Sequence, residues 1–192
     1  MARSPAPPSA SKFPRPAAVA GFSMIEVLIG LLVLCIGVLG MVSLQTHGLQ
    51  LSQSANQRST AVMLAQDLVE MMRSNPDATL NAANLFSNTS GYYKAAGSEF
   101  ASTSVANCAG LDRSAGGSAI ASQDLGCWLQ EVQSLLPVTS GLLKGNFTIC
   151  PSKQENSCAS GSSSVVMIQM AWQDKSGDCT DGICYYRLRA EL

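Results

Sequence analysis

Hydrophobic residues follow three patterns along the chain, beginning with an uninterrupted apolar stretch. Between Phe22 and Leu44 the only charged residue is Glu26. A helix over these residues would be about 34 Å long at 1.5 Å per residue, which is enough to cross a bilayer. We therefore predict a membrane-spanning helical segment over residues 22–44.

A one-sided helical pattern follows in residues 45–75. Apolar residues recur there at spacings of three and four, whereas Gln66, Glu70 and Arg73 fall on the opposite face. The apolar positions are Ala61, Leu64, Ala65, Leu68, Met71 and Met72. Residues 45–60 are mostly polar and are the place where fraying is expected. Asn75-Pro76 supplies a stop, which gives one helix from Phe22 to Ser74 of about 80 Å.

Residues 76–192 predict a globular domain of mixed structure. Residues 76–121 have no sustained period and suggest a connecting region, with a short helix near Thr79 to Phe86. Ser122 or Asp124 can cap a second helix that ends at Pro137. Its apolar positions are Leu125, Trp128, Leu129, Val132, Leu135 and Leu136.

Three strands are expected after that helix, at Asn146 to Cys150, Val165 to Gln173 and Cys184 to Leu192. Alternation in the middle strand places four apolar residues on one face, where they should meet Leu64, Leu68 and Met72. These four are Val166, Ile168, Met170 and Trp172. The predicted fold class is therefore α+β, with a long N-terminal helix packed on a small antiparallel sheet.

Six of the seven cysteines lie beyond the apolar stretch, and an even number there suggests disulfides in an oxidising compartment. Proximity favours the pairs Cys108 with Cys127, Cys150 with Cys158, and Cys179 with Cys184, although other pairings remain open. Cys35 lies in the apolar stretch and is expected to be free. Zinc is less favoured, because the spacings do not fit and the chain has one histidine.

The sequence also bears on binding of calcium and of nucleic acid, and on catalysis. Asp174, Asp178 and Asp181 crowd one loop and could hold calcium, but an Asp181-Gly182 turn explains most of that pattern. We expect no metal and no cofactor. A formal net charge of −1, without a basic stripe, gives no support for nucleic-acid binding. No catalytic set of residues can be assembled, so an enzyme is not expected.

The residues before the apolar stretch suggest a leader. Residues 1–21 are rich in Pro, Ala and Ser and end in Gly21, and basic residues there predict a cytoplasmic N-terminus: Arg3, Lys12 and Arg15. The junction from Gly21 through Phe22 to Glu26 resembles the leader junction of type IV prepilins. The resemblance implies cleavage after Gly21 by prepilin peptidase and N-methylation of Phe22. It also implies an assembly role for Glu26, which would pair with an N-terminal amine in the filament.

Within this family, residues 37–40, 44–45, 58–61 and 72–75 are most similar to minor pilins. That resemblance implies anchoring in the inner membrane with a periplasmic C-terminal domain, then a place in a surface pilus at or near its tip. The implied partners are other minor pilins, the major pilin, the inner-membrane assembly platform and a tip adhesin. Alternatives are a type II secretion pseudopilin, or an adhesive module on a pilin stalk with Tyr92 and Tyr93 exposed.

Overall fold

The structure, a computed structural model, describes residues 21–192, so the leader residues 1–20 lie outside the described part. The chain separates into two compact units, with the boundary between Leu44 and Gln45. The elements in chain order are α1 (Met24–Ser74), α2 (Pro76–Thr79), β1 (Phe86–Ser87), α3 (Gly117–Leu135), α4 (Ser140–Gly145), β2 (Thr148–Pro151), β3 (Ser162–Ser163), β4 (Val165–Gln173), the 3-10 turn η1 (Thr180–Gly182) and β5 (Ile183–Glu191).

The first unit contributes the apolar part of α1. The helix begins at Met24, two residues after the predicted start, and residues 21–44 are all exposed. Apolar side chains such as Leu32 and Leu39 are 61% and 70% exposed. By length and composition α1 is a candidate to cross a membrane. Exposing so many apolar side chains to water is unfavourable in free energy, so this part of the helix requires lipid or other protein around it.

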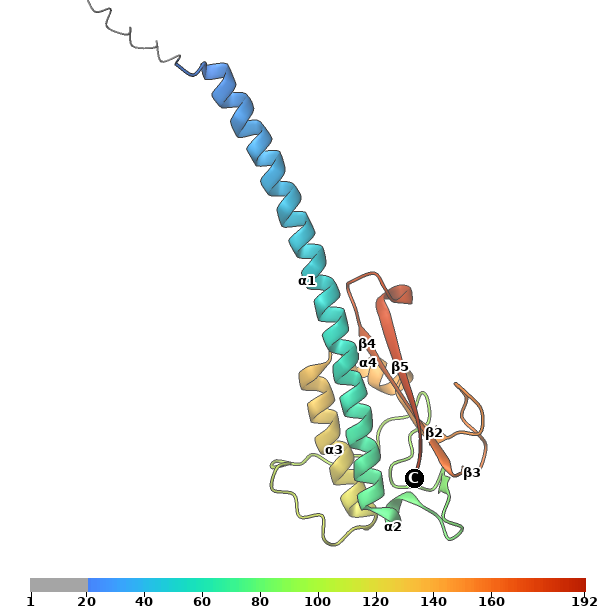
Figure 1. The fold of residues 1–192 in the computed structure, drawn as a ribbon. Coiled ribbons are helices and arrows are strands. Elements are labelled where there is room, and N and C mark those ends of the chain that lie inside the picture. The colour runs from blue at the N-terminus through green and yellow to red at the C-terminus, as the bar shows by residue number, and fades with distance from the viewer. Residues whose placement is uncertain (1–20) are drawn as a thin grey trace, which may run out of the picture. The chain divides into compact units, whose positions relative to one another are not determined.

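The second unit buries the apolar stripe of the remaining part of α1. Ala61, Leu64, Ala65, Leu68 and Met72 are at most 1% exposed, which confirms these positions of the predicted stripe. Met71, at the edge of the stripe, is only half-buried. Residues 45–60 continue as helix without interruption, and α1 ends at Ser74. Figure 1 shows α3 alongside this part of the helix, and the Trp128 Nε1–H of α3 donates to the Leu64 backbone oxygen at 2.8 Å.

The larger sheet has the strand order β2-β4-β5 and is antiparallel throughout. β4 has the bounds predicted for the middle strand, and β2 and β5 lie within two residues of theirs. Val166, Ile168, Met170 and Trp172 are at most 1% exposed and join Leu64, Leu68 and Met72 in one apolar core. The predicted α+β fold, with a long N-terminal helix and a small antiparallel sheet, is confirmed.

The connecting region differs from the prediction. No helix spans residues 79–86, because Leu80 is already extended and Phe86 pairs with Ser163 in the small β1-β3 sheet. The helix at this point is instead α2, which has Pro76 in its first turn. α3 begins at Gly117, before the expected caps Ser122 and Asp124. The short elements α4, β1 and β3 were not predicted: β1 and β3 depend on their pairing with each other, and α4 is a helix of only 6 residues, capped by Thr139.

Candidate functional site

The residues of the leader junction open the exposed helix. Phe22 is 83% exposed, and Glu26 stands in the first turn of α1, where its backbone N–H donates to the Ser23 oxygen at 3.0 Å. The positive end of the helix dipole favours a carboxylate at this position. Within residues 21–192 the Glu26 carboxylate has no ion-pair partner. It is therefore available to a positive group from outside the described chain.

Three disulfides join the six cysteines of the second unit. They are Cys108–Cys127, Cys150–Cys158 and Cys179–Cys184, the pairs that sequence proximity suggested. Cys35 is a free, exposed thiol. The Cys108–Cys127 disulfide ties the connecting loop to α3, whereas Cys150–Cys158 and Cys179–Cys184 close short loops next to β2 and β5.

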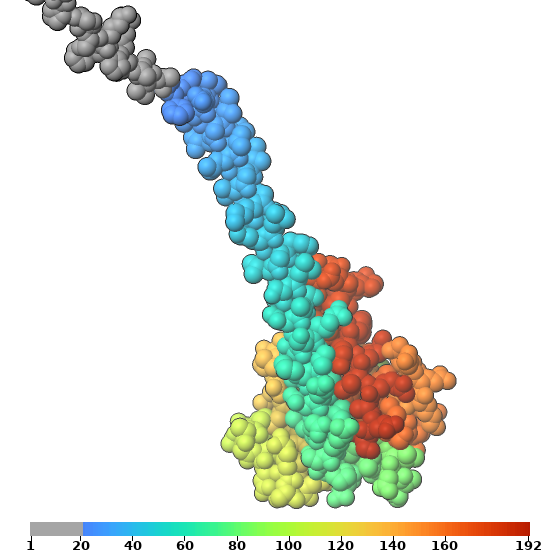
Figure 2. Space-filling view, in the orientation of Figure 1, coloured from blue at the N-terminus to red at the C-terminus, as the bar shows by residue number. Residues whose placement is uncertain are grey.

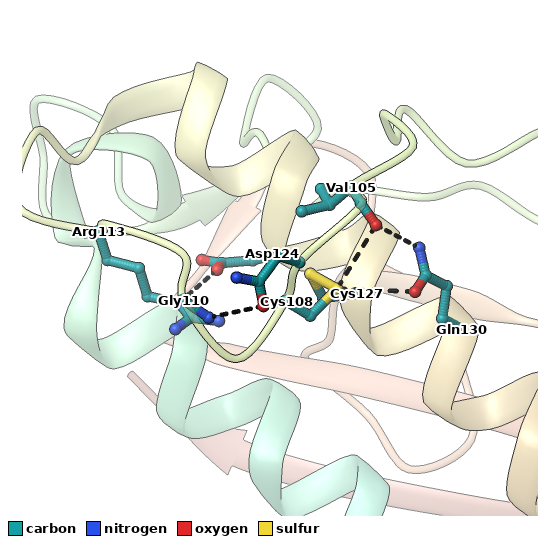
Figure 3. Close-up of a disulfide and its surroundings, with 8 residues drawn as sticks. Val105, Cys108, Gly110, Arg113, Asp124, Cys127 and Gln130 are labelled. Carbon is teal, nitrogen blue, oxygen red and sulfur yellow. Dashed lines mark hydrogen bonds and ion pairs between the residues drawn. A yellow bond between two sulfur atoms is a disulfide. The ribbon is translucent and has the colours of Figure 1, made fainter.

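The Cys108–Cys127 disulfide is accompanied by a buried ionic network. Asp124 of α3 is fully buried, and its carboxylate accepts from Arg113 Nε and from the Tyr92 hydroxyl, each at 2.7 Å. Figure 3 shows Cys108 and Arg113 reaching from the loop toward Cys127 and Asp124 on α3. Burial, reinforced by the hydrogen bond to Asp124, raises the pKa of Tyr92. A buried charge paired on both oxygens fixes the loop.

The structure around Asp124 corrects two expectations, one about Tyr92 and Tyr93 and one about Asn75. Tyr92 is fully buried and Tyr93 half-buried, so the two tyrosines do not form an exposed aromatic adhesive surface. Asn75, expected only to end the first helix, also joins α1 to α3. Its Oδ1 accepts from the Gly117 N–H at 2.8 Å, and its Nδ2 donates to the Gly117 oxygen at 3.0 Å.

A buried lysine, Lys94, holds together backbone segments that are distant in sequence. Lys94 is 1% exposed, and its ammonium donates to the Lys144 and Phe147 backbone oxygens at 2.9 and 2.7 Å. The ammonium also lies 5.1 Å from the centre of the Phe100 ring. Burial lowers the pKa of Lys94 to about 8. With its donors directed at carbonyls, this lysine holds backbone together, and nothing in the sequence singled it out.

The loop between β4 and β5 is held to α1. Ser54 Oγ donates to Asp174 Oδ2 at 2.6 Å, and this bond, with those from Ser176, lowers the pKa of Asp174. Asp178 and Asp181 do not join Asp174: the one group of potential metal ligands among residues 21–192 is Asp174 with Cys179 and Cys184, and both cysteines are in a disulfide. The calcium alternative is therefore not supported. Asp181 adopts a positive φ of 54°, as an Asp-Gly turn requires.

The fold and these sites together define a class of protein. An α+β chain with a long apolar N-terminal helix, small antiparallel sheets and three disulfides is consistent with the type IV pilin fold.

A family model described as type IV pilin Tt1218 matches residues 43–114, which supports a type IV pilin. No curated protein and no solved structure matches the chain significantly. The matched range begins after the junction residues Gly21, Phe22 and Glu26, so the two indications of a pilin come from separate parts of the chain.

Proposed function

We propose that this chain is a minor pilin of a type IV pilus, of the PilV type, that is incorporated at or near the tip and helps to initiate assembly with other minor pilins. The observation that carries the proposal is the junction Gly21-Phe22 followed by Glu26 at the start of the exposed apolar part of α1. The choice of PilV rests on the sequence blocks at 37–40, 44–45, 58–61 and 72–75.

Maturation would proceed at the junction. Prepilin peptidase cleaves after Gly21 and methylates the new N-terminus at Phe22, which leaves the apolar helix on the mature protein. In a filament core made of such helices, the Glu26 carboxylate loses its water. The loss of hydration is offset only by a positive partner, for which the N-terminal amine of Phe22 on a neighbouring subunit is suited.

Before assembly, the helix anchors the chain in the inner membrane, with the second unit in the periplasm. The disulfides fit that oxidising compartment. The proposed partners are other minor pilins, the major pilin, the assembly platform and a tip adhesin. The role is structural, without catalysis or cofactor.

The proposal is tested with variants of the junction in the native host. Gly21→Ala should leave the leader attached, visible as a larger protein on a gel, whereas Ser23→Ala should be processed normally. Glu26→Ala should be cleaved but should lower the number of pili, because the desolvated amine of its neighbour loses its partner. Mature-sized Gly21→Ala protein would refute the prepilin assignment. Normal pili with defective protein secretion would identify a type II pseudopilin instead.

A further inference from the structure

β5 forms one edge of the larger sheet. It pairs with β4 along its whole length, from the Gln173–Ile183 pair to the Val165–Glu191 pair. In the part of the chain that the structure describes, no strand pairs with its other side. A strand of this length that lacks a second neighbour presents free backbone N–H and C=O groups and can accept an added strand.

The alternation of hydrogen bonds between β4 and β5 identifies the backbone groups of β5 that are free. In an antiparallel pair, facing residues alternate between hydrogen-bonded and non-hydrogen-bonded pairs. The Leu192 N–H donates to the Ser164 oxygen, and the Asp174 N–H donates to the Gly182 oxygen. The backbone N–H and C=O groups of the even-numbered residues of β5 therefore point toward β4. The residues whose backbone groups point away from β4 are then Ile183, Tyr185, Arg187, Arg189 and Glu191.

A hydrogen bond to the Glu191 backbone oxygen supports the conclusion that the backbone groups of the odd-numbered residues point away from β4. The Glu191 oxygen accepts from Arg73 Nη2 of α1 at 2.9 Å, which is an outward contact. Among residues 21–192, the backbone groups of Tyr185, Arg187 and Arg189 that point away from β4 have no partner of this kind. Arg73 therefore caps one end of the edge and leaves its middle open.

A groove of about 420 Å³ runs between this edge and α1. Val69, Leu188 and Ala190 provide apolar lining, and Asp67 and Glu70 provide acidic lining. In Figure 2 the C-terminal residues lie at the surface beside the second part of α1, in the same unit.

The charge of the groove is unbalanced. Glu70 is ion-paired with Arg73 at 2.8 Å, whereas Asp67 has no ion pair within residues 21–192. The groove thus offers an apolar surface, one uncompensated carboxylate and a row of free backbone groups. This set matches an extended segment that presents apolar side chains and a basic one to the groove.

We propose that an extended segment of another protein adds to β5 as a strand, with apolar side chains on Val69, Leu188 and Ala190 and a basic side chain at Asp67. A second copy of this chain fits less well. Pairing β5 antiparallel with itself about its middle residue, Arg187, would place two copies of Arg187 opposite each other, which is unfavourable. The inference goes beyond the proposed function, since it concerns the second unit and does not depend on pilus membership.

The test uses the full chain in detergent micelles and a short synthetic peptide in which every second residue is valine, except that lysine replaces one of these valines, so that apolar and basic side chains share one face of the strand. Threonine fills the positions between them. Binding should slow hydrogen exchange at the amides of Tyr185, Arg187 and Arg189. Arg189→Pro removes an outward N–H without removing a bond to β4, and should weaken binding about tenfold. The matched control Arg189→Ala keeps that N–H and should bind at least as well, because it removes a cation beside a basic peptide.

Charge is tested separately. Asp67→Asn should weaken binding of the lysine peptide about threefold, and a peptide with glutamate in place of that lysine should bind more weakly to the unaltered chain. Equal effects of the two Arg189 variants, unprotected β5 amides, or equal binding of both peptides would each overturn the proposal. A dimer formed through β5 would assign the edge to a second copy and would also overturn it. If Arg189→Pro fails to fold by circular dichroism, Asp67→Asn and the peptide pair decide.

Discussion

Lys94 is the residue whose protonation should be visible in the stability of the protein. Its pKa is lowered by burial from 10.5 to about 8, so between these values the unfolded chain keeps a proton that the folded chain has released. Stability therefore rises with pH across that window, because the unfolded state binds more protons. We expect a gain of up to about 3 kcal/mol, measured as the free energy of urea unfolding by tryptophan fluorescence.

The comparison variant is Lys94→Met, whose unfolding free energy should lack this rise. Lys144→Met removes a lysine whose side chain is 54% exposed and should leave the rise unchanged. The unfolding measurements should extend no higher than about pH 10. Above that pH, tyrosine ionises in the unfolded chain, whereas the raised pKa of Tyr92 keeps it protonated in the folded chain, so the folded state loses stability. A wild-type curve parallel to that of Lys94→Met would show that Lys94 keeps its ordinary pKa.

At the residue scale the sequence predicted the cysteine pairs and the apolar positions but not the buried polar partners. Cysteines that pair lie close in sequence, with separations of 19, 8 and 5 residues, so proximity sufficed. Asp124 looked like a helix cap, yet it is bonded to Tyr92, which is 32 residues away. A pattern read along one segment does not contain such a partner.

At the scale of elements, Gly126 marks the close approach of the connecting loop to α3. A Cβ at this position would collide with the Thr103 backbone oxygen, and the Thr103 N–H donates to the Ser122 oxygen of α3 at 3.0 Å. Gly126→Ala should therefore displace the loop and lower stability by about 1–3 kcal/mol, despite the better helix propensity of alanine. Thermal unfolding followed by near-ultraviolet circular dichroism measures the loss.

Gly145→Ala is the matched control, because nothing lies within 4 Å of its Cβ position in α4. This variant should be neutral or slightly stabilised. If Gly126→Ala were equally neutral, the loop would not rest on α3 at Thr103.

The elements that the sequence predicted well are those with a long internal period. In β4 the predicted face takes every second residue from Val166 to Trp172, and the second part of α1 repeats every three or four, so burial of one face was readable in both. Met167 and Ala171, on the other face of β4, are buried as well. The short strands β1 and β3 have two residues each and exist through their pairing, Phe86 with Ser163. The start of α3 was misplaced because its N-cap, Gly116, forms no side-chain cap, whereas Ser122 and Asp124 are good capping types inside the helix.

At the scale of the whole molecule, the two units were separable from sequence because they follow different rules. The first has no core and exposes apolar side chains throughout, while the second buries its own. The junction residues Gly21, Phe22 and Glu26 are recognisable by type and spacing, without knowledge of the fold. The β5 edge and its groove were not predictable, because they combine α1 with the last strand of the chain.

The second unit is small, and its long connecting region carries little secondary structure, so its cross-links should contribute unequally to its stability. In the chain-entropy account, a disulfide stabilises more when it closes a longer loop. Cys108–Cys127 closes 19 residues and Cys179–Cys184 only 5. Replacing both cysteines by alanine should cost about 3 kcal/mol for the first pair and about 2 kcal/mol for the second, measured by urea unfolding.

Hydrogen exchange should rise in residues 101–116 for the first variant alone, since that loop also depends on Arg113 and Asp124. A larger loss for the Cys179–Cys184 variant would show that local strain or packing, rather than loop length, sets the contribution of each disulfide.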